Sequence, residues 1–220
     1  MFLRKKLAIS LCFSLFSLPA RTHRPPIMPM ATALRDARFE ALSKLTPRLA
    51  PQALEFALAA LQRVLTSGAQ VRSDVLMVVD YSKPSNERRL WVFDLVHTRV
   101  LFEELVAHGK NSGDNRAVRF SNAPNSLMTS LGTFLTGGTY IGKYGLSLRL
   151  QGLDRGINDN CMSRAIVIHA ADYVSDAIAR AKGRIGRSWG CPAVRPKIAR
   201  QLIETVQGGT LMFAYYPARS

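Results

Sequence analysis

The chain has 220 residues, which is long enough for one substantial domain and short for two. Lys and Arg total 30 against 15 Asp and Glu, so the formal net charge is +15. This charge favours association with a polyanion, such as nucleic acid, acidic lipid or an acidic cell-wall polymer. The alternative is that the basic residues simply form a solvated surface. After the N-terminal region, no segment is apolar for long enough to cross a membrane.

The first twenty residues predict a secretory signal peptide. The run Arg4-Lys5-Lys6 precedes the apolar stretch 7–18, and Pro19-Ala20 offer a small residue near a cleavage point. The apolar stretch is shorter than the about 20 residues that a transmembrane helix needs. We therefore expect export to the periplasm or cell envelope, with an uncleaved buried or membrane-surface helix as the alternative. Removing the three basic residues leaves a charge of +12.

A proline-containing linker and a helical arm are predicted next, at residues 21–30 and 31–70. The first helix is expected over 33–45, and the second from Pro51 to about Thr66, since proline is well placed at a first helical position. Four leucines of the second helix recur at spacings of four and three and form one apolar face: Leu54, Leu58, Leu61 and Leu65. We expect these helices to pack against the rest of the protein, and no residue in them suggests a catalytic or binding role.

Residues 71–220 predict a sheet-rich core that follows the helical arm, so the fold class is α+β, mainly β. Short β-rich runs separated by Gly, Pro, Ser and Asn indicate strands over 74–80, 89–95, 99–107, 132–135, 147–150, 164–169 and 210–216. Ser175 is expected to cap a short helix that stops at Gly183, and Pro196 to begin a last helix.

Cys191 and His169 form the most reactive pair that the sequence predicts. Cys191 lies in the cationic, glycine-rich run 183–194, and His169 ends the apolar run 165–168. A thiol attacks as the thiolate, and nearby arginines, an imidazole or backbone N–H groups lower its pKa. Gly190 lets the backbone turn, so that the N–H groups of residues 190 and 191 can point at a carbonyl oxygen. A histidine that ends an apolar strand is about as often a core residue as a base.

The sequence gives weaker support to two other kinds of site, a serine hydrolase and a zinc site. Ser188 stands in the pattern G-x-S-x-G, but no histidine follows it and Glu204 is the only later carboxylate side chain, which excludes a serine hydrolase of that type. Zinc sites usually contain close ligand pairs such as C-x-x-C, and the histidines and cysteines here form none. We therefore expect neither a metal nor a cofactor.

A disulfide is the main alternative for the cysteines. An exported chain without its first twenty residues keeps Cys161 and Cys191, in a compartment where disulfides persist. Such a bridge would consume the thiol and leave a catalytically silent wall-binding protein.

Residues 75–217 resemble the L,D-transpeptidase catalytic domain (YkuD-like), in particular its murein L,D-transpeptidase branch. The resemblance rests on the runs 108–113, 130–134, 145–150, 166–169 and 186–192. It implies a β-sandwich-like catalytic core in which Cys191 is acylated by a peptidoglycan stem peptide and His169 acts as its base. Carbapenems, to which the cysteine of this family is reactive, would then acylate Cys191.

The chain departs from the family at the catalytic motif. The usual S-H-G-C reads Ser188-Trp189-Gly190-Cys191, so a second histidine is missing, and Ala193 replaces a polar residue. Trp189 is then either an apolar wall beside the thiol or a core aromatic. The full set of candidate substrate-binding residues is Ser188, Trp189, Arg187, Arg149, Tyr144 and His108. Arg149 or Arg187 would bind a stem-peptide carboxylate, or belong to the basic surface, and His108 would line the cleft or be structural.

The resemblance implies an exported transpeptidase that releases D-alanine from a tetrapeptide stem. The resulting cysteinyl thioester would pass to an amine of another stem or of a protein lysine, and transfer to water would make the protein an L,D-carboxypeptidase. No nucleic-acid motif is present, so nucleic acid is not an expected partner. No membrane span is expected after removal of the signal.

Overall fold

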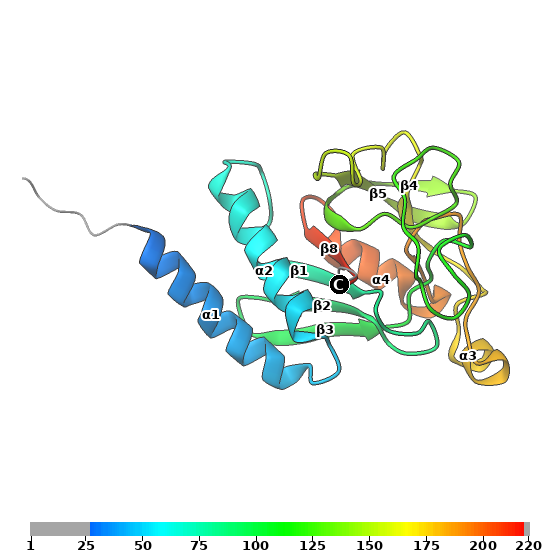
Figure 1. Ribbon diagram of the computed structural model, residues 1–220, viewed down its shortest axis with the longest axis horizontal. Helices are drawn as coiled ribbons and strands as arrows, with labels where there is room; N and C mark the ends of the chain where they lie inside the picture. Colours follow the sequence, from blue (N-terminus) through cyan, green and yellow to red (C-terminus); the bar gives the residue numbers. More distant parts are fainter. Residues whose placement is uncertain (1–26, 218–220) are drawn as a thin grey trace, which may run out of the picture.

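The computed structural model describes residues 27–217 of the chain (Figure 1). The elements within this range follow one another as α1 (Ile27–Leu45), α2 (Pro51–Thr66), β1 (Val75–Asp80), β2 (Leu90–Asp94), β3 (Arg99–Glu104), β4 (Gly132–Gly142), β5 (Gly145–Gly152), β6 (Val167–Ala170), α3 (Asp176–Lys182), β7 (Ala193–Val194), α4 (Pro196–Val206) and β8 (Leu211–Tyr215).

The strands form one mixed sheet in the order β3-β2-β1-β8-β4-β5-β6-β7. Neighbouring strands are antiparallel except for the pairs β1–β8 and β6–β7, which are parallel. The last strand, β8, therefore lies inside the sheet between β1 and β4, and both of its edges are hydrogen-bonded. This arrangement ties the end of the described chain to its first strand.

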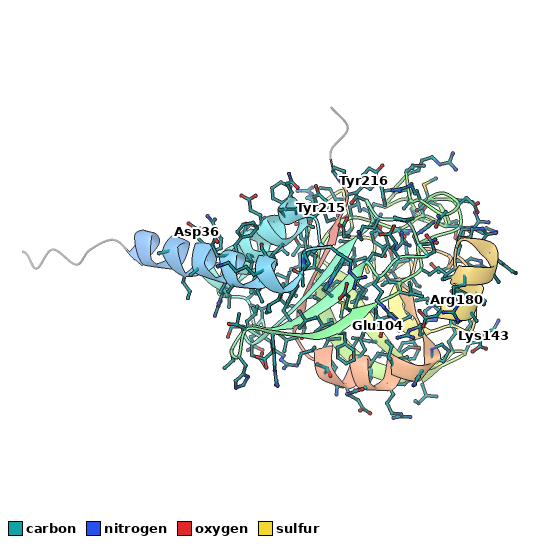
Figure 2. All side chains as sticks on the ribbon, turned by 90° about the horizontal axis from the view of Figure 1, so that it is seen from below. Asp36, Glu104, Lys143, Arg180, Tyr215 and Tyr216 are labelled. Atoms are coloured by element: carbon teal, nitrogen blue, oxygen red, sulfur yellow. The ribbon has the colours of Figure 1, made fainter. Side chains whose placement is uncertain are left out.

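Each face of the sheet carries its own apolar core. All six residues of β1 are buried, and successive side chains of a strand point to opposite faces. Leu76 and Val78 pack into the cluster formed with α2, whereas Met77 and Val79 belong to the cluster formed with α4. Figure 2 shows α4 on the opposite side of the strands from α1 and α2.

Local sequence signals explain where the shorter helices begin and end. Ser175 accepts a hydrogen bond from the Ile178 N–H at 3.2 Å and so caps the N-terminus of α3. Gly183 ends this helix with a φ of 65°, a left-handed conformation that glycine adopts without steric cost. Proline occupies the first turn of both α2 and α4, where its missing N–H leaves no hydrogen bond unmade.

The predicted fold class, α+β and mainly β with helices at the N-terminal end, is confirmed. The helix α1 begins at Ile27, so residues 27–30 of the predicted linker are helical. Pro29 then stands in the first turn, the one part of a helix that tolerates proline. The predicted signal peptide, residues 1–20, lies outside the described residues, and the division at residue 71 stays a prediction.

The second helix packs against the sheet. Leu54, Leu58 and Leu61 of α2 are buried in the core that this helix shares with β1 and β2.

Within residues 27–217, none of the helices has both the length and the apolar character that crossing a bilayer demands.

Candidate active site

The sheet brings His169 and Cys191 onto adjoining backbone segments. His169 lies in β6, and Cys191 precedes the first residue of β7 by two positions. Because β6 and β7 are parallel neighbours, with His169 opposite Ala193, the chain returns to the same edge of the sheet after α3. The two residues that the sequence predicts as a reactive pair therefore belong to neighbouring strands.

The hydrogen bond of His169 defines its tautomer. Its Nδ1 lies 2.7 Å from the carbonyl oxygen of Ala170, and since a carbonyl only accepts, Nδ1 must carry the proton. Nε2 is left with a free lone pair. The side chain is buried, and this burial lowers the pKa of His169 below its ordinary value. A neutral imidazole with one free lone pair has the properties of a general base.

The thiol of Cys191 is partly buried against the segment that precedes β6. Its Sγ lies 3.7 Å from the Ala165 carbonyl oxygen. Burial raises the pKa of the Cys191 thiol, while the Val167 backbone N–H and the Arg164 guanidinium lower it, by smaller amounts. Ala165, whose carbonyl the sulfur contacts, has a φ of 52°, a costly backbone conformation for a residue with a side chain.

Burial is the largest influence on the pKa of the Cys191 thiol, and burial also lowers the pKa of His169. At rest, both the thiol and the imidazole are therefore neutral.

This resting state predicts the pH dependence of thiol reactivity. The free thiol has a pKa of about 8.5 and histidine one of about 6.5. We expect alkylation of Cys191 by iodoacetamide to rise with a midpoint above that of free cysteine, because burial raises the pKa of the thiol. Protonation of His169 should reduce carbapenem acylation only below about pH 6.5, because burial lowers the pKa of this histidine. Full alkylation already at pH 6 would instead indicate a thiolate–imidazolium pair.

Ser188 holds the turn that carries Cys191. Its Oγ donates a hydrogen bond to the Cys191 carbonyl oxygen at 2.6 Å and accepts one from the Gly190 N–H at 3.0 Å. Its backbone N–H and carbonyl bond to His108 and Lys110. Ser188 is buried and shapes the turn in this structure, while its contact with a substrate stays a prediction.

The sequence predicts two backbone donors for an oxyanion, and one of them already has a hydrogen-bond partner in the structure. The Gly190 N–H donates to Ser188 Oγ, whereas no hydrogen bond among the described residues uses the Cys191 N–H. Gly190 has a different role, because its φ is 122° and a Cβ there would approach the Met128 carbonyl oxygen to 2.7 Å. Glycine is required because the turn packs directly on the backbone of residue 128.

Arg187 and His108 stabilise the surrounding loops. Arg187 donates to the Gly113 carbonyl oxygen at 3.0 Å and lies 3.4 Å from an Asp114 carboxylate oxygen. His108 is completely buried, and its Nδ1 accepts a hydrogen bond from Arg89 at 2.8 Å. Burial, helped by the Arg89 charge, lowers the pKa of His108 to about 4. Of the two alternatives that the sequence leaves open for His108, a cleft residue or a structural one, its complete burial favours the structural one.

Two exposed aromatic side chains flank the reactive pair. The Tyr144 ring stacks on the His169 ring, with centroids 4.5 Å apart and an angle of 21° between the planes. Trp189, directly before the Gly190-Cys191 turn, is 72% exposed, which excludes a core aromatic. Both rings are available to contact a bound molecule near the thiol.

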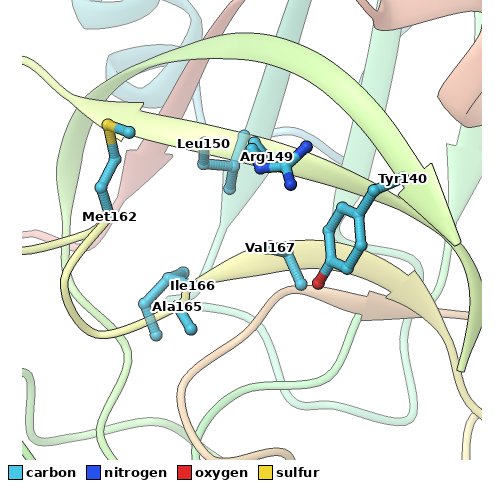
Figure 3. Close-up of a pocket in the computed structure, with 7 residues that line it drawn as sticks. All are labelled: Tyr140, Arg149, Leu150, Met162, Ala165, Ile166 and Val167. Carbon is cyan, nitrogen blue, oxygen red and sulfur yellow. The ribbon is translucent and has the colours of Figure 1, made fainter. Parts of the chain in front are cut away.

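A pocket of about 250 Å³ is lined in part by the segment that contacts the thiol (Figure 3). Its lining residues come from β4, β5, the start of β6 and the segment before it: Tyr140, Arg149, Leu150, Met162, Ala165, Ile166 and Val167. Figure 3 shows Arg149 and Tyr140 at one end and Met162 at the other. The Arg149 guanidinium lies 4.5 Å from the Tyr140 ring centroid. Arg149 pairs with no carboxylate of the described residues, so its charge is free for an anionic group.

The second cysteine is a poor nucleophile. Cys161 is completely buried, and its Sγ donates to the Leu150 carbonyl oxygen at 3.3 Å. Burial raises the pKa of this thiol to about 12. Both Cys161 and Cys191 are free thiols in this structure, so it lacks the disulfide weighed as an alternative. In the described part of the chain, no three His, Cys, Asp or Glu side chains are grouped to hold a metal ion.

A family comparison identifies the fold. Residues 45–215 match the model of the L,D-transpeptidase catalytic domain, a range that includes α2 and every strand of the sheet. The chain therefore belongs to the L,D-transpeptidase catalytic domain family. The matched model is that of a catalytic domain, and the matched range contains both His169 and Cys191.

Several solved L,D-transpeptidases are distantly similar to the chain. One from Mycobacterium smegmatis is 16% identical, with 65% of this chain and 59% of that chain covered and a TM-score of 0.40. LdtMt1 in complex with imipenem is 15% identical, with 64% and 59% covered and a TM-score of 0.40. The protein from Stackebrandtia nassauensis is 15% identical, with 84% and 77% covered and a TM-score of 0.38. The match thus spans 59% of the first two structures. Among curated proteins, none matches the chain.

Proposed function

We propose that this protein is a cysteine-dependent L,D-transpeptidase that acts on peptidoglycan stem peptides, with Cys191 as nucleophile and His169 as general base. The observation that carries the proposal is the pairing of β6 with β7. Through this pairing, His169, whose Nε2 is free, lies next to the segment that holds the partly exposed Cys191. Family membership supplies the reaction class.

The first half-reaction forms a thioester. His169 Nε2 takes the proton of the Cys191 thiol, and the sulfur attacks the carbonyl carbon between the third residue and the terminal D-alanine of a tetrapeptide stem. The amide C–N bond then breaks, and D-alanine leaves with the proton returned by His169. The Cys191 N–H donates to the oxyanion in the tetrahedral intermediate, and the loss of one such donor typically costs about 3–4 kcal/mol.

The second half-reaction transfers the acyl group. An amine attacks the thioester carbonyl, His169 removes the surplus proton from the amine nitrogen, and the C–S bond breaks to restore the thiol. An amine from another stem gives a crosslink, one from a protein lysine gives a covalent attachment, and water gives a carboxypeptidase. The ratio of crosslinked dimer to tripeptide, measured with a synthetic tetrapeptide, distinguishes the first outcome from the last.

The pocket lined by residues 165–167, the segment whose Ala165 carbonyl contacts the Cys191 sulfur, suits the donor stem. Its aliphatic lining matches the methylene chain of a diamino acid, and the free guanidinium of Arg149 matches a carboxylate. Tyr144 and Trp189 supply apolar contacts on either side of the reactive pair. The net charge of +15 favours an acidic wall polymer, and export through residues 1–20 would bring the protein to it.

Carbapenem labelling tests the nucleophile and the reaction class together. The thiolate would open the β-lactam ring by attack on its carbonyl, so the adduct has the full mass of the drug. We expect intact-mass measurement to show one adduct on the native protein and none on Cys191→Ala, since Cys161 is completely buried.

The matched control is Cys161→Ala, which removes the other thiol of the described chain and should keep the adduct. An adduct on Cys191→Ala would contradict the assignment of the nucleophile. Absence of a free thiol in the native exported protein would favour the silent, disulfide-bridged alternative.

A further inference from the structure

Arg164 is anchored by four hydrogen bonds to a single loop. Its Nη1 donates to the Ser121 carbonyl oxygen at 2.9 Å and to Ser130 Oγ at 2.5 Å. Its Nη2 donates to Ser126 Oγ at 3.1 Å and to the Met128 carbonyl oxygen at 2.6 Å. All four acceptors are neutral oxygens from the segment 121–130, so this loop fixes the position of the guanidinium.

The charge of Arg164 is not neutralised by the protein. No carboxylate of the described residues lies within ion-pair distance of it, in contrast to Arg88 and Arg195, which both pair with Glu104 and Asp176. Partial burial lowers the pKa of Arg164, which reports the cost of holding this charge away from water. A fixed, unpaired guanidinium that is partly desolvated is available to compensate a negative charge nearby.

The guanidinium lies against the turn that carries the nucleophile. A Cβ on Gly190 would approach Arg164 Nη2 to 3.3 Å and the Met128 carbonyl oxygen to 2.7 Å. The same Met128 oxygen accepts the hydrogen bond from Arg164. Arg164 thus contacts the loop and the turn at the residue directly before Cys191.

The other titratable groups near the Cys191 sulfur stay neutral in the useful pH range. Burial raises the pKa of Tyr81 and that of Cys161 to about 12 each, and it also raises the pKa of Tyr173. On β6, His169 is the group that changes charge, and burial lowers its pKa. Between about pH 7 and pH 10, Arg164 is therefore the principal cation acting on the thiolate.

We propose that Arg164 is a positioning residue of the Cys191 site, whose fixed positive charge stabilises the thiolate while its guanidinium holds the loop 121–130 against the catalytic turn. This inference rests on the proposed nucleophile. It gives the sequence run before His169 a function that neither the catalytic motif nor the family match assigns.

Alkylation by iodoacetamide between pH 6 and pH 10 tests this role in the full chain. We expect Arg164→Met to move the midpoint of the rate profile to higher pH and to reduce the rate at pH 7.5 on the order of tenfold, the effect of losing one neighbouring opposite charge. Arg164→Lys keeps a positive charge but loses the planar fork, and should recover most of the rate. Arg164→Gln replaces the methionine variant in this comparison if the latter does not fold.

The matched control is Arg180→Met on the surface of α3 (Figure 2), which should leave the profile unchanged. A midpoint that is the same for Arg164→Met and the native protein would overturn the proposal. Equal impairment of the methionine and lysine variants would also overturn it, because the role would then be structural. Failure of the transpeptidase proposal would appear separately, as a missing carbapenem adduct on a protein whose thiol still alkylates.

Discussion

Replacing His169 by alanine is expected to reduce the second-order rate of carbapenem acylation at pH 7.5 by about 10²–10⁴-fold, the usual contribution of a general base. Burial raises the pKa of the Cys191 thiol, so little thiolate forms at this pH without a base. The hydrogen bond from Nδ1 to Ala170 presents Nε2 for this purpose. Intact-mass measurement against time gives the rate for each variant.

The matched control is His97→Ala, in the hairpin between β2 and β3. The His97 side chain is 67% exposed and pairs with Asp94, far in the sheet order from β6. This variant should acylate at the native rate. If His169→Ala and His97→Ala reacted equally fast, another group would have to be the base. Alkylation of His169→Ala at pH 10 should approach the native rate, since hydroxide then ionises the thiol and the imidazole is no longer needed.

Elements with strong local signals could be predicted from the sequence. The helix Pro51–Thr66 has the predicted bounds because its proline start and its leucine spacing both lie within the segment. The hairpin of β4 and β5 is much longer than predicted, covering Gly132–Gly142 and Gly145–Gly152. Its glycines and threonines carry little apolar periodicity, and cross-strand pairing extends the strands. The two-residue strand β7 was not predicted, because only its pairing with β6 defines it.

The sequence predicts His169 and Cys191 as a reactive pair, and the structure puts them on neighbouring backbone segments, but most of their surroundings could not be predicted. Residue type and the order of the motifs pointed to His169 and Cys191 without any knowledge of their distance. The role proposed for Arg164 could not be predicted, because the hydrogen-bond partners that fix its guanidinium lie 34–43 positions earlier in the chain. For His108, a position at the end of a strand did not reveal the buried Arg89 that it meets.

A partly buried ion-pair network fixes the chain directly after the turn that carries Cys191. Glu104, at the end of β3 and labelled in Figure 2, accepts hydrogen bonds from Arg195 at 2.5 and 2.7 Å and from Arg88 at 2.9 Å. Asp176 at the start of α3 lies 2.5 Å from Arg195 and 3.4 Å from Arg88. Arg195 follows β7, so the network joins β3, α3 and the start of α4 at the exit of the Cys191 turn.

Glu104→Gln is expected to lower the free energy of unfolding by about 3–5 kcal/mol, because removing one partner of a buried pair leaves uncompensated charge. The Glu104 side chain is 9% exposed and that of Arg195 is 18% exposed, so water replaces little of the lost interaction. The two arginines would then share Asp176 alone. For a folded unit of this size the expected fall in the melting temperature is roughly 6–20 °C. Urea unfolding followed by tryptophan fluorescence measures the change, since Trp91 is completely buried in the sheet.

Glu204→Gln makes the same chemical change on the surface of α4. Glu204 lies 3.3 Å from Arg200 in an i,i+4 pair, with side chains 53% and 74% exposed. An exposed pair of this kind contributes about 0.3–0.5 kcal/mol, so this control should unfold close to the native midpoint. Equal losses for the two glutamate variants would mean that the network at Glu104 stabilises no more than a surface pair does. A large loss confined to Glu104→Gln, with slower carbapenem acylation below the melting temperature, would show that the network also holds the Cys191 turn in its reactive geometry.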